Sequence, residues 1–152
     1  MNALGQNFLF ASVMFMAGVG IPIMGALSGG LGARLQSPAL AAVVLFVVGF
    51  IIAALYLFFV EGLPNALPSA TIPVQYYLGG VFIIFYTLSI TIIGPKFGIG
   101  NAVCFVLLGQ LVSMTVIDHF GLLGSLQYSL TIQRLFGLLL MATGVFLVVK
   151  RF

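Results

Sequence analysis

Charged side chains are almost absent from this 152-residue chain. It has five Lys or Arg and two Asp or Glu residues, so 5% of its side chains are charged, against about 25% in a typical soluble domain. Hydrophobic residues make up 62% of the chain, and the mean hydropathy is +1.32. A soluble protein cannot cover its surface with so few charges. The composition therefore predicts an integral membrane protein and excludes a soluble enzyme, a nucleic-acid-binding protein and a disordered tail.

Groups that bind metals or perform covalent catalysis are equally scarce. The single cysteine, Cys104, allows no internal disulfide and no multi-cysteine metal site. One histidine, His119, and two carboxylates, Glu61 and Asp118, are too few for a metal site or a catalytic cluster. We therefore expect no metal, no cofactor and no enzymatic activity.

Five apolar stretches are long enough to cross a membrane, since a spanning helix needs about 20 mostly apolar residues. They cover residues 7–29, 38–60, 77–94, 99–117 and 132–149. Ser37–Pro38 and Thr131 are typical of helix starts, whereas Gly94–Pro95 and Gly121 are typical of helix ends. The sequence thus predicts an all-α fold, a bundle of five transmembrane helices forming one domain over residues 1–152.

The few basic residues predict an orientation. Arg34, Lys96, Lys150 and Arg151 fall on one side of the expected topology, and only Arg134 falls on the other. Because cytoplasmic loops carry an excess of Lys and Arg, we expect the N-terminus outside and the C-terminus in the cytoplasm. Five helices place the two ends on opposite sides, and two such units in opposite orientations form the inverted repeat of many secondary transporters.

The first helix contains a group of residues that indicates bending. Pro22 removes a backbone hydrogen bond in mid-helix, and Gly18 and Gly25 lie close to it in the sequence. These residues predict a bend beside a substrate cavity, or alternatively a tightly packed helix with no such role. Gly25 and Gly29 form a GxxxG pair, which predicts the close approach of a neighbouring helix.

Polar residues in the third and fourth helices are candidates for a substrate cavity. Gln110 and Ser113 are three residues apart and share one helix face. A primary amide in the bilayer needs a hydrogen-bond partner, which is either another helix or a bound substrate. Tyr86 either stacks on an organic substrate or only packs against neighbours. Asn101 lies on the opposite face to Gln110, so we expect it to bond at the helix end.

Two oppositely charged residues lie near the expected outer end of the bundle. Asp118 closes the fourth helix and Arg134 begins the fifth, at the same expected depth. We therefore predict an Asp118–Arg134 ion pair, acting either as an outer clamp or as a simple link between two helices. No acidic residue lies at mid-membrane, so the chain brings no central ion switch of its own. Asp118–His119 is the only candidate for a proton relay.

Several different short motifs are distributed along nearly the whole chain. The most specific run from Gly109–Gln110 and Ser113 through Asp118–His119–Phe120–Gly121 to Arg134 and Gly137. The others are Ser37–Pro38 with Ala42, Phe46 and Gly49, then Leu78–Gly79–Gly80, Pro95 with Gly98, Gly124, and Gly144–Val145. In these motifs the chain resembles the YdcZ-type family of small inner-membrane exporters, within the drug/metabolite transporter superfamily.

The resemblance implies a bacterial or archaeal inner-membrane protein with the five-helix half of a ten-helix fold. It implies that two units, identical or paralogous, pair around a central cavity and export a small organic molecule. The family often carries Gln and, four residues later, Asn in the first helix, where this chain has Met24 and Ser28. Met24 is therefore a candidate for a more apolar cavity wall.

We therefore expect a transporter that works as a dimer by alternating access, with Gln110, Ser113, Tyr86 and Met24 as the substrate-binding residues. The strong charge bias favours a heterodimer with an oppositely oriented paralogue if the two units are inverted. The alternative is an accessory membrane subunit without transport activity. That alternative predicts polar residues satisfied entirely by neighbouring helices.

Overall fold

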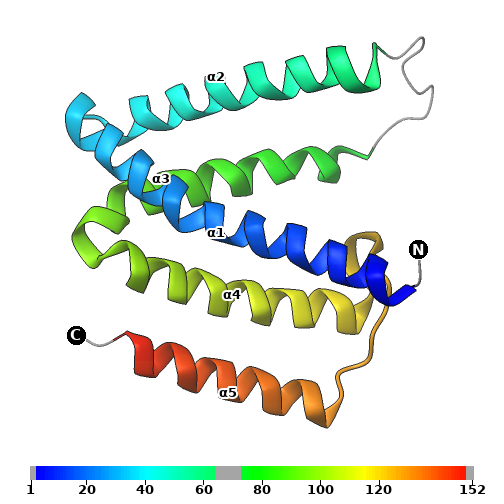
Figure 1. Ribbon diagram of the computed structural model, residues 1–152. Helices are drawn as coiled ribbons and strands as arrows, with labels where there is room; N and C mark the ends of the chain where they lie inside the picture. The colour runs from blue at the N-terminus through cyan, green and yellow to red at the C-terminus, as the bar shows by residue number, and fades with distance from the viewer. Residues whose placement is uncertain (1–2, 64–72, 150–152) are drawn as a thin grey trace. The chain divides into compact units, whose positions relative to one another are not determined.

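The computed structural model describes residues 3–63 and 73–149, and all regular structure among them is helical. Its α-helices are α1 (Ala3–Leu35), α2 (Pro38–Tyr56), α3 (Gly79–Phe97), α4 (Ile99–Phe120) and α5 (Ile132–Val148) (Figure 1). A π-helical turn, η1 (Leu57–Glu61), extends α2, and two 3₁₀ turns, η2 (Val74–Leu78) and η3 (Leu122–Gly124), precede α3 and follow α4. The predicted all-α class is confirmed.

Four helical segments are long and apolar enough to cross a membrane: Asn7–Leu35, Pro38–Glu61, Val74–Phe97 and Ile99–Phe120. The fifth, α5, has 17 residues, at the lower end of the range of about 17–25 that a span requires. The distribution of side chains is the reverse of that in a soluble protein. Most large apolar side chains are exposed, whereas most of the buried residues are small or carry hydroxyl groups, with Ile90, Val145 and Val149 as the exceptions. This arrangement suits a protein that is surrounded by lipid.

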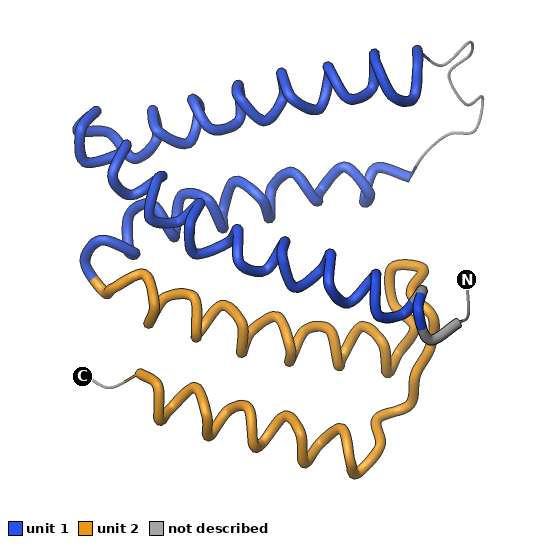
Figure 2. The backbone as a smooth tube through the Cα atoms, viewed as in Figure 1, with its two compact units in different colours: residues 1–96 blue, residues 97–152 orange. Residues whose placement is uncertain are grey.

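The chain divides into two compact units, residues 1–96 and residues 97–152 (Figure 2). The first unit contains α1, α2 and nearly all of α3, and the second contains α4 and α5. In the first unit α1 and α2 are joined by a tight connection. Ser37 caps α2, because its Oγ accepts a hydrogen bond from the Leu40 N–H at 3.2 Å, and Pro38 is the first helical residue. The helix start predicted at Ser37–Pro38 is confirmed.

A face of small residues on α1 packs against α3. The Ser28 hydroxyl forms a hydrogen bond with the Thr91 hydroxyl. Thr91 Oγ1 also lies 2.7 Å from the carbonyl oxygen of Thr87, to which it donates. A Cβ on Gly29 would lie 2.9 Å from Cγ of Pro95, so only glycine permits this contact. The close helix approach predicted from Gly29 is present in the structure.

The prediction that Gly94–Pro95 ends the third helix is wrong. Pro95 lies inside α3, which continues to Phe97. A proline near the end of a helix removes only one terminal hydrogen bond, and here its ring is packed against Gly29. The helix ends before Gly98, which has a φ of 92°, a value that favours glycine.

The first helix also extends further than predicted. Instead of ending at Gly29, α1 continues to Leu35. Glycines weaken an isolated helix, but Gly29 and Gly32 are buried, and a Cβ on Gly32 would lie 3.0 Å from Cγ2 of Thr91. Tertiary packing thus outweighs the local preference. The helix ends before Gln36, whose φ of 51° turns the chain toward Ser37.

In the second unit the segment between α4 and α5 folds back on the end of α4. The left-handed Gly121 (φ 60°, ψ 35°) ends α4 as predicted. The four contacts of this segment are Ser125 Oγ to Ile117 O (3.3 Å), Tyr128 N to Asp118 O (2.8 Å), Gln127 Nε2 to His119 O (3.1 Å) and Leu130 N to His119 Nδ1 (3.1 Å). The first three satisfy carbonyl groups that a helix end leaves without partners, and the fourth uses the imidazole ring of His119 as the acceptor. Thr131 then caps α5, since its Oγ1 accepts from the Arg134 N–H at 3.2 Å.

Candidate functional site

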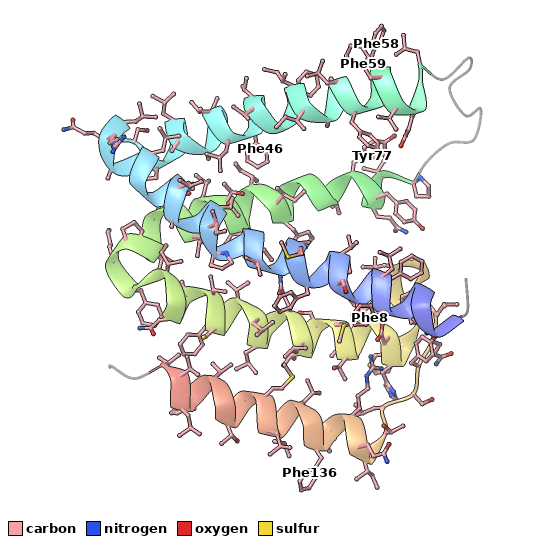
Figure 3. The ribbon with its side chains drawn as sticks, in the orientation of Figure 1. Phe8, Phe46, Phe58, Phe59, Tyr77 and Phe136 are labelled. Carbon is pink, nitrogen blue, oxygen red and sulfur yellow. The ribbon has the colours of Figure 1, made fainter. Side chains whose placement is uncertain are left out.

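The first unit contains an apolar cavity that includes Met24 in its wall. Its volume is about 570 Å³, and it is lined by Met24, Leu45, Phe46, Val48, Gly49, Phe50, Ile52, Ala53 and Thr87. Phe46 points from α2 toward α3, whereas Phe58 and Phe59 point away from it (Figure 3). Thr87 supplies the only hydroxyl group of this lining. Met24 therefore contributes to an apolar wall, and its role as a substrate-binding residue stays a prediction.

Tyr86 lies beside Thr87 in the sequence but does not line this cavity. Its side chain is partly exposed, and its hydroxyl oxygen is buried without a hydrogen-bond partner among the described residues. A buried hydroxyl without a partner is energetically costly. Tyr86 thus keeps one hydrogen-bonding group available for an additional partner.

Gln110 and Ser113 lie in the second unit, on one face of α4, and both side chains are exposed. Neither makes a side-chain hydrogen bond to any residue in the described part of the chain. Asn101 behaves differently, because its Nδ2 donates to the carbonyl oxygen of Phe97 at 3.0 Å. The helix-end role expected for Asn101 is therefore observed. The polar face of Gln110 and Ser113 is left open for a ligand or a partner chain.

The three residues of the expected bending element occupy different environments along α1. The helix is continuous through Pro22, which is half-buried. Gly18 is exposed, with open space where a Cβ would lie, and Gly25 is buried. Bending at these positions stays a prediction.

Asp118 and Arg134 come together across α4 and α5. Arg134 Nη2 donates to Asp118 Oδ2 at 2.5 Å, and the two side chains are 32% and 19% exposed. The pair forms part of a polar pocket of about 400 Å³, with Tyr128, Ser129 and Thr131 as its other lining residues. Charge and position along the chain were enough to predict the pair. Thr131 is placed beside Arg134 by its role as the cap of α5. Tyr128 and Ser129 carry no sequence signal that would place them here, because only the folded segment after α4 brings them to Arg134.

His119 positions this segment through both its backbone and its ring. Nδ1 accepts the Leu130 N–H, so a neutral imidazole here carries its proton on Nε2. The ring also packs edge-on against Phe120, with a centroid distance of 4.8 Å. In the described residues, no group of three or more His, Cys, Asp or Glu side chains is placed to hold a metal ion.

These features define an α-helical, multi-pass membrane protein. A family model described as "Putative inner membrane exporter, YdcZ" matches residues 9–147. The chain therefore belongs to the YdcZ family, and the predicted resemblance is confirmed. It is an inner-membrane protein of a family of membrane transporters rather than enzymes. No curated protein and no solved structure matches the chain.

Proposed function

We propose that this chain is one half of an exporter for a small organic molecule, working by alternating access with a second five-helix unit. The observation that carries the proposal is the exposure of Gln110, which lies in the middle of α4 (Ile99–Phe120). Leaving a primary amide without hydrogen bonds in the hydrocarbon core costs several kcal/mol, on the order of 2–7 kcal/mol. Exposure of the Gln110 face to lipid is therefore unfavourable, whereas contact with a polar cavity or with a partner chain is favourable.

The alternative of an accessory subunit accounts less well for the same residues. It predicts that neighbouring helices satisfy the polar groups of the chain. This holds for Thr91, whose hydroxyl group bonds to that of Ser28 on α1. Thr115 is satisfied within its own helix, because its hydroxyl group donates to the carbonyl oxygen of Leu111. It does not hold for Gln110, whose amide has no partner in the described residues. The accessory-subunit alternative thus leaves the Gln110 amide unexplained within this chain, whereas the transport proposal places it in a polar cavity.

Thiol labelling tests whether the Gln110 face lines a water-accessible cavity. In a Cys104→Ala background, Gln110→Cys and Ser113→Cys should react with a membrane-impermeant thiol reagent. Val112→Cys is the matched control, because Val112 is 52% exposed on the same helix but lies about 200° around it from Gln110. We expect labelling of the first two variants and not of the third. Equal labelling of all three, or none at Gln110→Cys, would contradict a cavity at this face.

Export itself is tested by comparing the small molecules released from cells that contain the chain, its Gln110→Leu variant or neither. We expect the chain, together with its partner if one is needed, to increase the release of at least one organic molecule. Loss of one hydrogen bond to the substrate should reduce that release by roughly tenfold in the variant. Identical release from all three cell types would support the accessory-subunit alternative.

A further inference from the structure

The pocket at Asp118 and Arg134 is chemically distinct from the apolar cavity of the first unit. All five residues that line it carry polar side chains: Asp118, Tyr128, Ser129, Thr131 and Arg134. Its volume of about 400 Å³ falls within the range of roughly 300–1,000 Å³ that is typical of small-molecule sites. In a chain with seven charged side chains, this pocket holds one of each sign.

The ion pair leaves hydrogen-bonding capacity on both partners. A guanidinium group has five N–H donors, and Nη2 of Arg134 is the group that contacts Asp118. The contact uses Oδ2 of Asp118, so Oδ1 remains available as an acceptor. Both side chains are partly buried yet still exposed to the pocket, where charges interact more strongly than in bulk water.

The start of α5 strengthens the attraction for an anionic group beside Arg134. Thr131 caps the helix by accepting the Arg134 N–H, while the first helical N–H groups have no intrahelical acceptors. The N-terminus of a helix carries a partial positive charge. The Arg134 side of the pocket is thus positive and the Asp118 side negative, and Tyr128 and Ser129 of the segment before α5 add neutral hydroxyl groups to the lining.

We propose that this pocket binds a small zwitterion, with its carboxylate at Arg134 and its ammonium group at Asp118. A simple anion would be repelled by Asp118, and a simple cation would be repelled by Arg134. A molecule with both groups satisfies both sides and keeps the site neutral. The inference rests on the proposed export function, because it assigns a chemical class to the substrate at the outer end of the transporter.

Three probes of similar size separate these possibilities: alanine, propionate and ethylamine. Their binding to the purified full chain in lipid nanodiscs is measured by ligand-observed NMR. We expect alanine to bind at least about tenfold more tightly than either singly charged analogue, since each charged subsite contributes a charge-assisted hydrogen bond. Equal affinity for the three probes, or no binding of any of them to folded protein, would overturn the proposal.

Substitutions locate the binding site. Asp118→Asn should lower the affinity for alanine to that for propionate, because it removes the negative side of the pocket. Tyr128→Phe and Ser129→Ala leave the ion pair intact and should each weaken alanine binding by about 2–10-fold. The control is Arg34→Gln, which removes a charge in the last turn of α1, outside the pocket, and should leave binding unchanged. Equal losses in Arg34→Gln and Ser129→Ala would place the binding elsewhere.

Binding and export are measured separately, so the two proposals can fail independently. If the chain exports a molecule but does not prefer alanine, the zwitterion assignment is wrong and the transport function stands. If alanine binds as expected but cells with and without the chain release the same molecules, the binding site stands and the export function does not.

Discussion

Gly29 determines how closely α1 and α3 can pack in the first unit. A Cβ at this position would lie 2.9 Å from Cγ and 3.4 Å from Cδ of Pro95. The proline ring is stiff, so it can yield only slightly. Gly30, the next residue, is exposed and has open space where its Cβ would lie. Two adjacent glycines in one helix therefore have opposite structural roles.

We predict that Gly29→Ala destabilises the protein by about 1–3 kcal/mol through overpacking against Pro95. Gly30→Ala is the matched control, and it should be neutral or stabilise by up to about 1 kcal/mol, because alanine favours the helix. The apparent melting temperature in detergent, measured by size-exclusion chromatography of a fluorescent fusion, reports the difference. Equal melting temperatures for the two variants would show that α1 and α3 do not pack as described.

Some residue-level features were predictable and others were not. The ion pair of Asp118 and Arg134 follows from two opposite charges at one expected depth. The Ser28–Thr91 hydrogen bond joins residues that are 63 positions apart, and no local pattern connects them. The sequence singled out Ser28 only as a departure from the family, and its actual role emerges from the close approach of two helices.

The segment between α4 and α5 shows how an element that lacks regular structure can still be well fixed. Its contacts to the carbonyl groups at the end of α4 come from Ser125, Gln127 and the backbone of Tyr128. The His119 ring holds the far end of the segment by accepting the Leu130 N–H. This arrangement brings Tyr128 and Ser129 to the polar pocket.

We predict that His119→Ala loosens this segment, because Leu130 N–H loses its acceptor. One hydrogen bond contributes about 0.5–1.5 kcal/mol, so amide exchange near Leu130 should accelerate by roughly 2–10-fold. Leu126→Ala is the control in the same segment, since Leu126 is 75% exposed. Hydrogen exchange measured by mass spectrometry over this segment distinguishes the variants. The same exchange rate in both would show that the imidazole does not hold the segment.

Helix boundaries illustrate which elements the sequence can predict. Ser37, Thr131 and Gly121 were identified correctly because a cap depends on the chemistry of neighbouring residues. The end of α3 was misplaced because Pro95 is stabilised by its contact with Gly29, a residue of another helix. Glycine and proline are ambiguous signals in membrane helices, where they serve packing as often as termination.

At the scale of the whole molecule, the distribution of charged residues predicts how the chain is oriented in the membrane. The orientation in turn limits the partner chains with which it can form an inverted pair. Arg34 and Lys96 lie in the last turns of α1 and α3. Glu61 ends the π-helical turn after α2, and Asp118 lies near the end of α4. This charge pattern is the one from which the N-terminus is expected outside, and the orientation stays a prediction. Lys150 and Arg151, which contribute to the same bias, lie outside the described residues.

The orientation of the chain when it is expressed alone tests the proposed pairing. We expect a C-terminal green fluorescent protein to fluoresce and a C-terminal alkaline phosphatase to be inactive, because positive charge holds the C-terminus in the cytoplasm. The double variant Arg34→Ala/Lys96→Ala should reduce the ratio of fluorescence to phosphatase activity. Arg134→Ala, which removes a charge on the opposite side, should not reduce this ratio. A chain with one orientation cannot form an antiparallel dimer with itself, so an inverted pair would require a paralogue. Strong activity of both reporters on the unaltered chain would instead show two orientations, and the preference for a heterodimer would then be wrong.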